Sequence, residues 1–475
     1  MALDRRDWMM VNRTGPRIGL LTLMFEIYDM FEYLEPDMVE FTNELVSEIG
    51  RFCEVSWPGV CKTRDQVQNA VSGFEEGKMD GIIVVLLTYA PSYIAAKPLI
   101  DTRLPLVIFN TQRLEEVTND MDPRDLIRNH GVHGVQDLAN VLGRADRKFA
   151  VVTGHYRDKE ALKALREWCL AASTVSYLGS LKVGVLGSVL RGMGDFSLDE
   201  TQLLCTTGVE VVHLAQREIA RLAKDAPDID VRVQMEEDGK RFQVSADVTP
   251  EEHEESSRLE WAIRRALAME NIESLAANFM SIDEEMQLGT LPFLASSKLL
   301  SEGFGYAAEG DVLTAIIVGA MQKLAGAANF TEMFTMDPKG GALLMSHMGE
   351  SNPSMARDDR PIELVAADFE LASTAFRPLL LRFALAPGEV TLVNLTVTSG
   401  GRFKMISTRG SVLDFPPIPG INTPHFKFKP ELPLAEFLTK MCAEGCSHHF
   451  ALAYGDWTPL VSKIADILGI EFSTV

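Results

Sequence analysis

The chain has 475 residues, enough for about three domains, and its 46% hydrophobic and 24% charged residues exclude an intrinsically disordered protein. With 45 Lys and Arg against 67 Asp and Glu, the net charge is -22, so nucleic acids are not expected partners. Because it has no apolar run long enough to span a membrane, no signal-peptide core after Met1 and only 6 cysteines, we expect a cytoplasmic protein with reduced thiols and no membrane partner.

The N-terminal part alternates apolar runs with amphipathic stretches. Its runs are apolar on both faces, as in strands of a buried parallel sheet, and the stretches between them have helical spacing. This alternation predicts a doubly wound, Rossmann-like α/β domain over residues 1–180, with ligands at the carboxyl ends of its strands. The expected strands are residues 18–24, 81–87, 104–109 and 149–153, and the expected helices are 38–49, 64–74 and 136–142.

A middle α/β domain is predicted over residues 181–325. It opens with a strand-like run at 181–186. The sequence Thr249-Pro250-Glu251-Glu252 has Thr at an N-cap, Pro at the first helical position and Glu at the third, so it predicts the start of a helix. A further helix is expected at 311–324.

The C-terminal domain, predicted over residues 326–475, is β-rich and barrel-like. Residues 388–397 alternate apolar and polar side chains, and 400–401 form a turn before a strand at 402–408. The prolines between 416 and 433 predict a long irregular connection, and the chain ends in a helix at 460–468 and a strand at 470–475. We therefore expect an α/β protein with three domains.

The candidate chemistry lies in glutamates and histidines of the second half. Glu309 and Glu332 each stand in a nearly uncharged apolar context, where a carboxylate is costly to bury without a compensating cation. His347 and the adjacent pair His448-His449 follow in the sequence. Two carboxylates and two imidazoles would suit a divalent cation.

Each of these residues also has a simpler interpretation. Glu309 could pair with a helix N-terminus, Glu332 could lie on the surface, and His347 could be a hydrogen-bonded core or loop residue. Adjacent histidines point in different directions on a regular element, so at most one of His448 and His449 is expected to be a metal ligand.

Two other motifs indicate different chemistry. Cys442 and Cys446 beside the histidine pair suggest a zinc site, although the second cysteine pair of such a site is missing. The stretch 192–195 (Gly-Met-Gly-Asp) is similar to part of a dinucleotide-binding loop without its third glycine.

At these residues the sequence resembles the L-arabinose isomerase family, within the L-fucose and L-arabinose isomerase group. LSEGFGYAAEGDVLTA at 300–315, NFTEMFT at 329–335, SHMGESNPSMA at 346–356 and EGCSHHF at 444–450 match, in order, the family segments that hold its metal ligands. Two further segments agree: AVVTGHYRD at 150–158, and 131–134, which contains His133.

The resemblance implies a three-domain fold, Mn²⁺ or another divalent cation, and a homo-oligomer (trimer or hexamer) with the active site near a subunit interface. It implies Glu309, Glu332, His347 and His449 as metal ligands. His448 would bind substrate or orient a neighbouring group, and His133, from a neighbouring chain, would bond a sugar hydroxyl.

The sequence departs from the family in two segments. The family segment Gly-Ser-Gln-His-Leu-Tyr-Gly, which helps to hold the sugar, is replaced by LMFEIY at 23–28, which makes Phe25 a candidate sugar contact. The family's Met-Arg-Glu is Leu-Arg-Gly at 190–192. The identity of the sugar therefore does not transfer from the family.

These features predict an intramolecular oxidoreductase: a metal-dependent aldose–ketose isomerase acting on a pentose, hexose or related sugar. Its intermediate would be an enediolate, with Glu309 and Glu332 as ligands and as acid and base. Two alternatives stay open. One is a sugar-binding protein without catalysis, and the other is an epimerase or lyase that uses the same enediolate chemistry.

Overall fold

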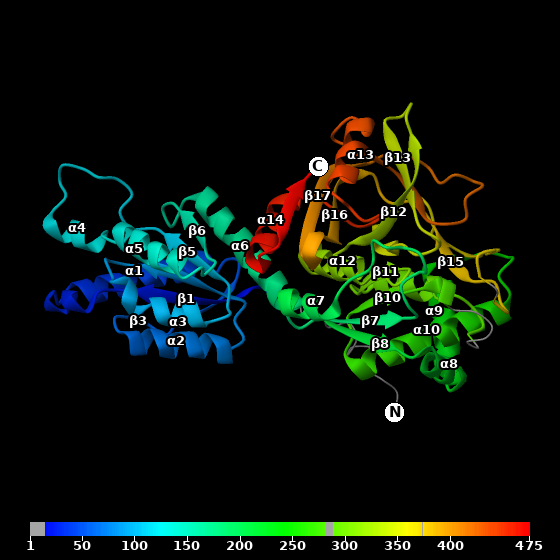
Figure 1. Cartoon of the computed structure of the whole chain (residues 1–475), viewed down its shortest axis with the longest axis horizontal. Helices are drawn as coiled ribbons and strands as arrows, with labels where there is room; N and C mark the ends of the chain where they lie inside the picture. Colours follow the sequence, from blue (N-terminus) through cyan, green and yellow to red (C-terminus); the bar gives the residue numbers. More distant parts are fainter. Residues whose placement is uncertain (1–14, 282–287, 373) are drawn as a thin grey trace. The chain divides into compact units, whose positions relative to one another are not determined.

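The computed structural model describes residues 15–281, 288–372 and 374–475 (Figure 1). It divides into two compact units within the chain, one in residues 12–176 and one in residues 177–475, called here the N-terminal unit and the large unit. Among the described residues, no helix combines the length and apolar character needed to cross a membrane.

The N-terminal unit is built on a parallel sheet with the strand order β2-β1-β4-β5-β6. Helices α2, α3 and α5 share an apolar cluster with three of these strands, so the sheet is buried on that face. The predicted doubly wound domain is confirmed. The strands are β1 (Arg17–Leu23), β2 (Glu54–Ser56), β3 (Val60–Cys61), β4 (Gly81–Leu86), β5 (Leu106–Asn110) and β6 (Ala150–Thr153), and the helices are α1 (Leu34–Ile49), α2 (Arg64–Glu76), α3 (Ala96–Asp101), α4 (Pro123–Arg128), α5 (Val132–Arg144) and α6 (Lys159–Leu178).

The large unit begins with a second parallel sheet, in the order β11-β10-β7-β8. The predicted helix start is confirmed, because Thr249 caps α10 (Pro250–Glu270) and Glu252 returns a bond to the cap. The strands are β7 (Lys182–Leu186), β8 (Glu210–Leu214), β10 (Ser274–Ala277) and β11 (Gly305–Ala308), and the other helices are α7 (Glu200–Thr207), α8 (Gln216–Lys224), α9 (Asp228–Arg241), α11 (Phe293–Ser301) and α12 (Val312–Ala325).

Six of the other described strands of the large unit form a closed barrel. The pairings run β16-β19-β12-β13-β18-β17, and β17 pairs again with β16, so the ring has no open edge. The β-rich, barrel-like C-terminal part is thereby confirmed. Its strands are β12 (Asn329–Asp337), β13 (Ala342–Ser346), β16 (Gly388–Val397), β17 (Phe403–Val412), β18 (His425–Pro430) and β19 (His449–Tyr454), with β20 (Glu471–Thr474), α13 (Leu434–Ala443) and α14 (Thr458–Leu468) outside the ring and a small sheet of β9 (Gln243–Val244), β14 (Glu363–Ala366) and β15 (Leu379–Arg382).

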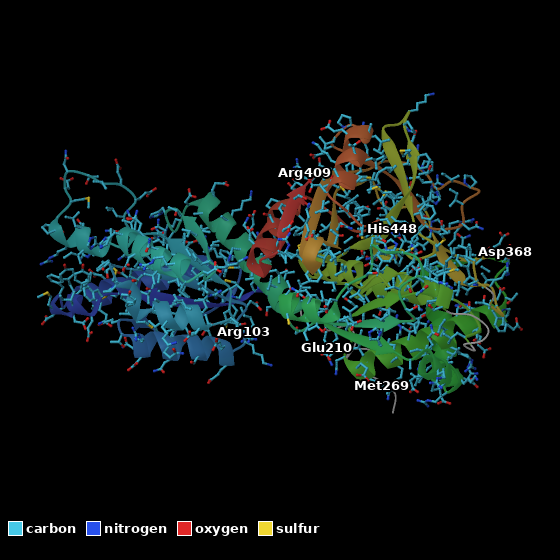
Figure 2. All side chains as sticks on the ribbon, in the orientation of Figure 1. Arg103, Glu210, Met269, Asp368, Arg409 and His448 are labelled. Carbon is cyan, nitrogen blue, oxygen red and sulfur yellow. The ribbon has the colours of Figure 1, made fainter. Side chains whose placement is uncertain are left out.

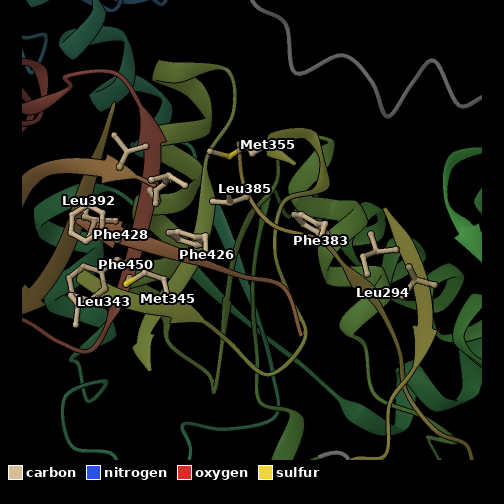
Figure 3. Packing of buried hydrophobic residues seen from close by; sticks show 14 of the residues in the cluster. Leu294, Leu343, Met345, Met355, Phe383, Leu385, Leu392, Phe426, Phe428 and Phe450 are labelled. Carbon is tan, nitrogen blue, oxygen red and sulfur yellow. The ribbon is translucent and has the colours of Figure 1, made fainter. Parts of the chain in front are cut away.

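Large apolar side chains from neighbouring barrel strands form one buried cluster (Figure 3). Leu343 and Met345 of β13 lie on one face of their strand because they are two residues apart, and Phe426 and Phe428 of β18 do the same. Burying such side chains stabilises the fold by about 1.5–3 kcal/mol each. The barrel is therefore a rigid support for polar residues at its strand ends.

One expectation for this region is wrong. The proline-rich stretch 416–433 is not irregular throughout, because it contains β18, which pairs with β13. Pro424 precedes this strand and Pro430 is its last residue, so the prolines flank the ladder and do not interrupt it.

Helix α11 connects the two parts of the large unit through buried polar contacts. Lys298 forms ion pairs with Asp238 at 2.7 Å and with Glu260 at 2.6 Å, which fixes the helix against α9 and α10. The adjacent Ser297 hydroxyl accepts a hydrogen bond from the Ser351 N–H at 3.2 Å. This bond holds the loop that follows β13.

Candidate metal centre

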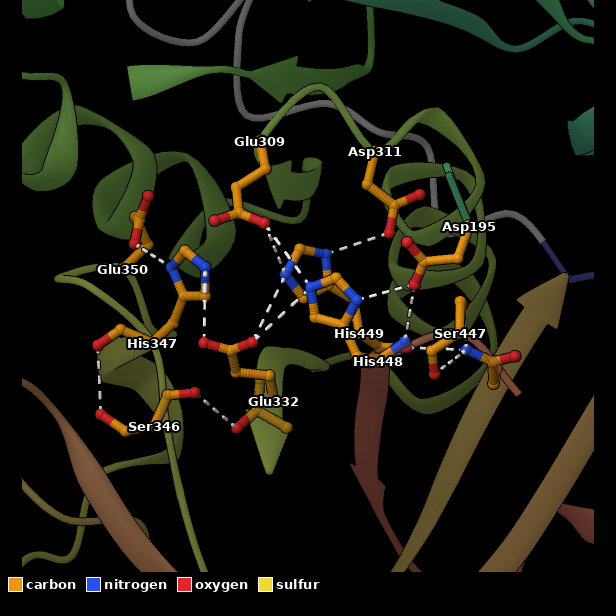
Figure 4. A network of polar contacts seen from close by, with 12 residues as sticks. Asp195, Glu309, Asp311, Glu332, Ser346, His347, Glu350, Ser447, His448 and His449 are labelled. Atoms are coloured by element: carbon orange, nitrogen blue, oxygen red, sulfur yellow. Dashed lines mark hydrogen bonds and ion pairs between the residues drawn. The ribbon is translucent and has the colours of Figure 1, made fainter. Parts of the chain in front are cut away.

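Three neighbouring barrel strands bring a row of polar residues together (Figure 4). In the register of the sheet, Glu332 on β12 is opposite His449 on β19 and opposite Ser346 on β13. His347 directly follows Ser346. Because opposed residues of antiparallel strands lie about 5 Å apart, the strand pairing itself places one glutamate between two histidines.

Glu309 reaches the same place from the parallel sheet. It follows β11 and precedes α12, at the carboxyl end of the strands, where ligands of α/β sheets collect. Its backbone is left-handed, with φ 60, and Gly310 follows with φ 77. A left-handed glutamate is strained, and such strain is concentrated at functional sites. The Glu309 carbonyl accepts a bond from the Leu190 N–H at 3.0 Å, which fixes the turn.

Nitrogen and oxygen atoms of these residues converge. The Nε2 atom of His449 lies 3.6 Å from Glu309 Oε2 and 3.9 Å from Glu332 Oε2, and His347 Nε2 lies 4.0 Å from Glu332 Oε1. Two sets of three residues could each hold a metal ion, because their ligand atoms lie within 4.8 Å of one another. One set is Glu309, His448 and His449, and the other is Glu332, His347 and His449. Together these two candidate metal groups contain all four expected ligands.

Three of the converging atoms are buried and have no hydrogen-bond partner among the described residues: Glu309 Oε2, His347 Nε2 and His449 Nε2. Leaving a buried polar group unpaired costs about 1–3 kcal/mol. Carboxylate oxygens and imidazole nitrogens are the atoms that a divalent cation binds, so such an ion would give partners to these atoms. The residues present therefore fit such an ion.

Each histidine of the centre has a carboxylate on the opposite side of its ring. A ligating histidine typically donates its other N–H to such a group, which fixes the tautomer and the orientation of the ring. With Nδ1 bonded in this way, Nε2 is directed at the centre. The pairs are His347 with Glu350 at 2.7 Å, His449 with Asp311 at 3.1 Å and His448 with Asp195 at 2.7 Å.

The pKa values of these groups show strong mutual interaction. Burial would lower the pKa of His347, but the charge and hydrogen bond of Glu350, together with the charges of Glu332 and Glu309, outweigh it and raise that pKa. Burial would raise the pKa of Glu350, but the charge of His347 and the hydrogen bonds from His347 and Tyr306 together lower it. For His448, contacts with Glu309 and Asp195 overcome the effect of burial and raise the pKa to about 9. A cation would therefore compete with protons for these imidazoles.

The expected divergence of His448 and His449 is wrong. The Nε2 atom of His448 lies 3.6 Å from Glu309 Oε2, the same distance as that of His449. Alternation applies inside a strand, but β19 begins at His449 and His448 lies in the bend before it. Both rings consequently face the centre. Figure 2 labels His448 among the side chains of the large unit.

Sequence reasoning missed the carboxylates behind the histidines. Glu350 follows His347 by three residues, so its spacing could have indicated it, and Asp311 could have been found as the N-cap of α12. Asp195, in the stretch that is similar to a dinucleotide loop, lies 253 positions from His448, so no local pattern links them. In the described part of the chain, neither candidate metal group includes Cys442 or Cys446.

Phe25 and His133, the expected sugar contacts, belong to the N-terminal unit. Phe25 follows β1, and His133 lies on α5. The ring of Tyr89 packs edge-on against Phe25, with centroids 5.8 Å apart, and stacks on His133 at 4.4 Å. The two residues therefore share one aromatic cluster within that unit, near the carboxyl ends of β1 and β4.

Comparison with known proteins gives matches along almost the whole chain. Models of the L-arabinose isomerase N-terminal, central and C-terminal domains match residues 28–179, 190–327 and 327–471. The L-arabinose isomerase of Aeromonas salmonicida is 26% identical over 406 residues, 83% of this chain and 80% of the relative. That of Mycolicibacterium smegmatis is 25% identical over 433 residues, 88% of this chain and 84% of the relative. With three consecutive domains matched in order, the chain belongs to the L-arabinose isomerase family.

Proposed function

We propose that the chain is an aldose–ketose isomerase that depends on a divalent cation and acts on a free pentose, hexose or related sugar. Its family and the names of its relatives support a sugar isomerase, which is an intramolecular oxidoreductase. The observation that carries the proposal is the set of buried, unpaired atoms of Glu309, His347 and His449, which belong with Glu332 to two candidate metal groups that share His449.

Glu309, Glu332, His347 and His449 would hold the cation, for which we propose Mn²⁺. When bound, such an ion supplies a Lewis acid that stabilises negative charge developing on the sugar oxygens. The chain's own contribution is pre-arrangement of the ligands. The Nδ1 atoms of both histidines are already bonded to carboxylates, so their Nε2 lone pairs are fixed toward the centre.

Glu332 and Glu309 move the protons of the reaction. The Glu332 side chain is 18% exposed against 8% for Glu309, so we assign the carbon proton to Glu332. Its carboxylate takes the proton from C2 of the open-chain aldose as the C1–C2 double bond of the enediolate forms, and later returns it to C1. Glu309 moves the hydroxyl proton from O2 to O1, which leaves the ketose carbonyl at C2.

Aromatic rings keep water from the inner side of the centre. Phe330 is fully buried, and its ring centroid lies 4.8 Å from those of both His347 and His449. A low-dielectric wall of this kind strengthens the electrostatic interactions on the sugar oxygens.

The remaining parts of the proposal concern the sugar and the assembly. Phe25 and His133 would contact the sugar, and His448 would form a hydrogen bond with one of its hydroxyls. As the family resemblance implies, His133 would come from a neighbouring chain of a homo-oligomer, a trimer or hexamer. We also propose that the protein acts in the cytoplasm.

The test combines metal analysis with a sugar panel. Protein treated with a chelator and then reloaded with Mn²⁺ is expected to bind one ion per chain. It should also interconvert at least one aldose–ketose pair of a panel that includes L-arabinose and L-ribulose. Chelation should abolish the conversion. Bound ion without any conversion would favour the non-catalytic sugar-binding alternative, whereas epimers or cleavage products would favour the epimerase or lyase. Absence of bound Mn²⁺ would overturn the metal centre.

A further inference from the structure

Three carboxylates bond the Nδ1 atoms of the histidines, and Asp195 is more exposed to solvent than the other two, Glu350 and Asp311. The side chains of the His347–Glu350 and His449–Asp311 pairs are at most 2% exposed. In the third pair, His448 and Asp195 are 38% and 36% exposed. Of these three pairs, the pair with Asp195 therefore marks the side of the centre that solvent, and hence a sugar, reaches.

Asp195 holds His448 at two points with the same oxygen. Its Oδ2 atom lies 2.7 Å from the ring Nδ1 and accepts a longer bond, at 3.3 Å, from the His448 backbone N–H. On the other side of the ring, Nε2 lies 3.6 Å from Glu309 and 3.8 Å from Glu332. The imidazole thus stands between Asp195 and the centre, so Asp195 acts on the centre only through His448.

The residue after Asp195 fixes the same ring from its face. Phe196 is 1% exposed, and its ring centroid lies 4.8 Å from those of both His448 and His449. The loop that carries both residues is anchored to the centre, because Leu190 donates its N–H to the carbonyl of Glu309. The loop of Asp195 is therefore attached, at Leu190, to the backbone of a proposed metal ligand.

We propose that Asp195 is a positioning residue of the isomerase, which fixes the ring orientation of His448 so that its Nε2 atom can form a hydrogen bond with a sugar hydroxyl. This inference rests on the proposed function. A carboxylate at Nδ1 binds the proton on that nitrogen, so the ring is held with Nε2 on the side of the centre. An amide in the same place has no charge and can also turn its NH₂ group toward Nδ1, so it would hold the ring less firmly.

The substitution Asp195→Asn tests this role. We expect kcat/KM for the sugar that the wild type converts to fall about tenfold, while the Mn²⁺ dissociation constant, measured by calorimetric titration, and the melting temperature stay at wild-type values. Asp199→Asn is the matched control. It changes an aspartate of the same loop that caps α7, where asparagine caps equally well, so wild-type activity is expected.

A double-mutant cycle with His448→Ala separates positioning from a general structural effect. If Asp195 acts through His448, adding Asp195→Asn to His448→Ala should cause no further loss. An additive loss, wild-type kcat/KM in Asp195→Asn, or a weaker Mn²⁺ affinity in that variant would each overturn the role of Asp195. A wild-type protein that binds Mn²⁺ and converts no sugar would instead remove the proposed function itself, and this inference with it.

Discussion

Glu332→Gln is expected to lower isomerase activity by about a thousandfold or more, because the amide cannot take the proton from carbon. Gln has nearly the same size and keeps one oxygen, and the Glu332 side chain is 18% exposed, so the barrel should stay folded. The measurement is kcat with the sugar found in the panel, together with a melting curve and the Mn²⁺ stoichiometry.

A matched control for this variant lies on the same barrel. Glu389 is exposed on β16, and Glu389→Gln makes the same chemical change away from the centre, so its activity should equal that of the wild type. If Glu332→Gln kept near wild-type turnover with a good substrate, the assignment of Glu332 as base would be wrong. If it unfolded, the experiment would be repeated with Glu332→Asp, which keeps the charge and moves the carboxylate.

Glu350→Gln is expected to weaken Mn²⁺ binding by about a hundredfold. Glu350 is fully buried and accepts bonds from the Tyr306 hydroxyl at 2.8 Å and from His347 Nδ1 at 2.7 Å. An amide could keep the first bond, but its NH₂ group would face Nδ1 and favour the tautomer with a proton on Nε2. That tautomer has no lone pair to offer a metal.

Calorimetric titration of the chelator-treated variant with Mn²⁺ measures this effect directly. Tyr306→Phe is the companion variant, because it removes only the hydroxyl donor to the other carboxylate oxygen. It should change Mn²⁺ affinity much less than Glu350→Gln. Equal affinities of Glu350→Gln and wild type would contradict both the role of Glu350 and that of His347 as a ligand.

The elements that could be predicted from the sequence are those with a strong local signal. The Thr249 cap was recognisable because its hydrogen-bonding residues are three positions apart. The alternation at 388–397 coincides with β16. The strand β18 was missed because nearby prolines dominate the local pattern, although they lie at its ends.

The residues of the candidate site also differ in whether a local sequence signal marks them. Glu309 and Glu332 were recognisable because a carboxylate in an apolar segment needs a partner, and His347 and His449 because imidazoles are common ligands. The orientation of His448 depends on where β19 begins, which no pattern fixes to a single residue. Asp311 and Asp195 meet their histidines across 138 and 253 positions, so only the folded chain brings them together.

The carboxylate behind each imidazole has a consequence for the choice of substrate. The network contains the carboxylates of Asp195, Glu309, Asp311, Glu332 and Glu350, and no lysine or arginine takes part in its hydrogen bonds and ion pairs within the described chain. Five negative charges less the two positive charges of a divalent ion leave a formal charge of minus three when the imidazoles are neutral. A phosphate ester would be repelled from such a pocket, whereas an uncharged polyol carbonyl compound would enter it without an electrostatic penalty.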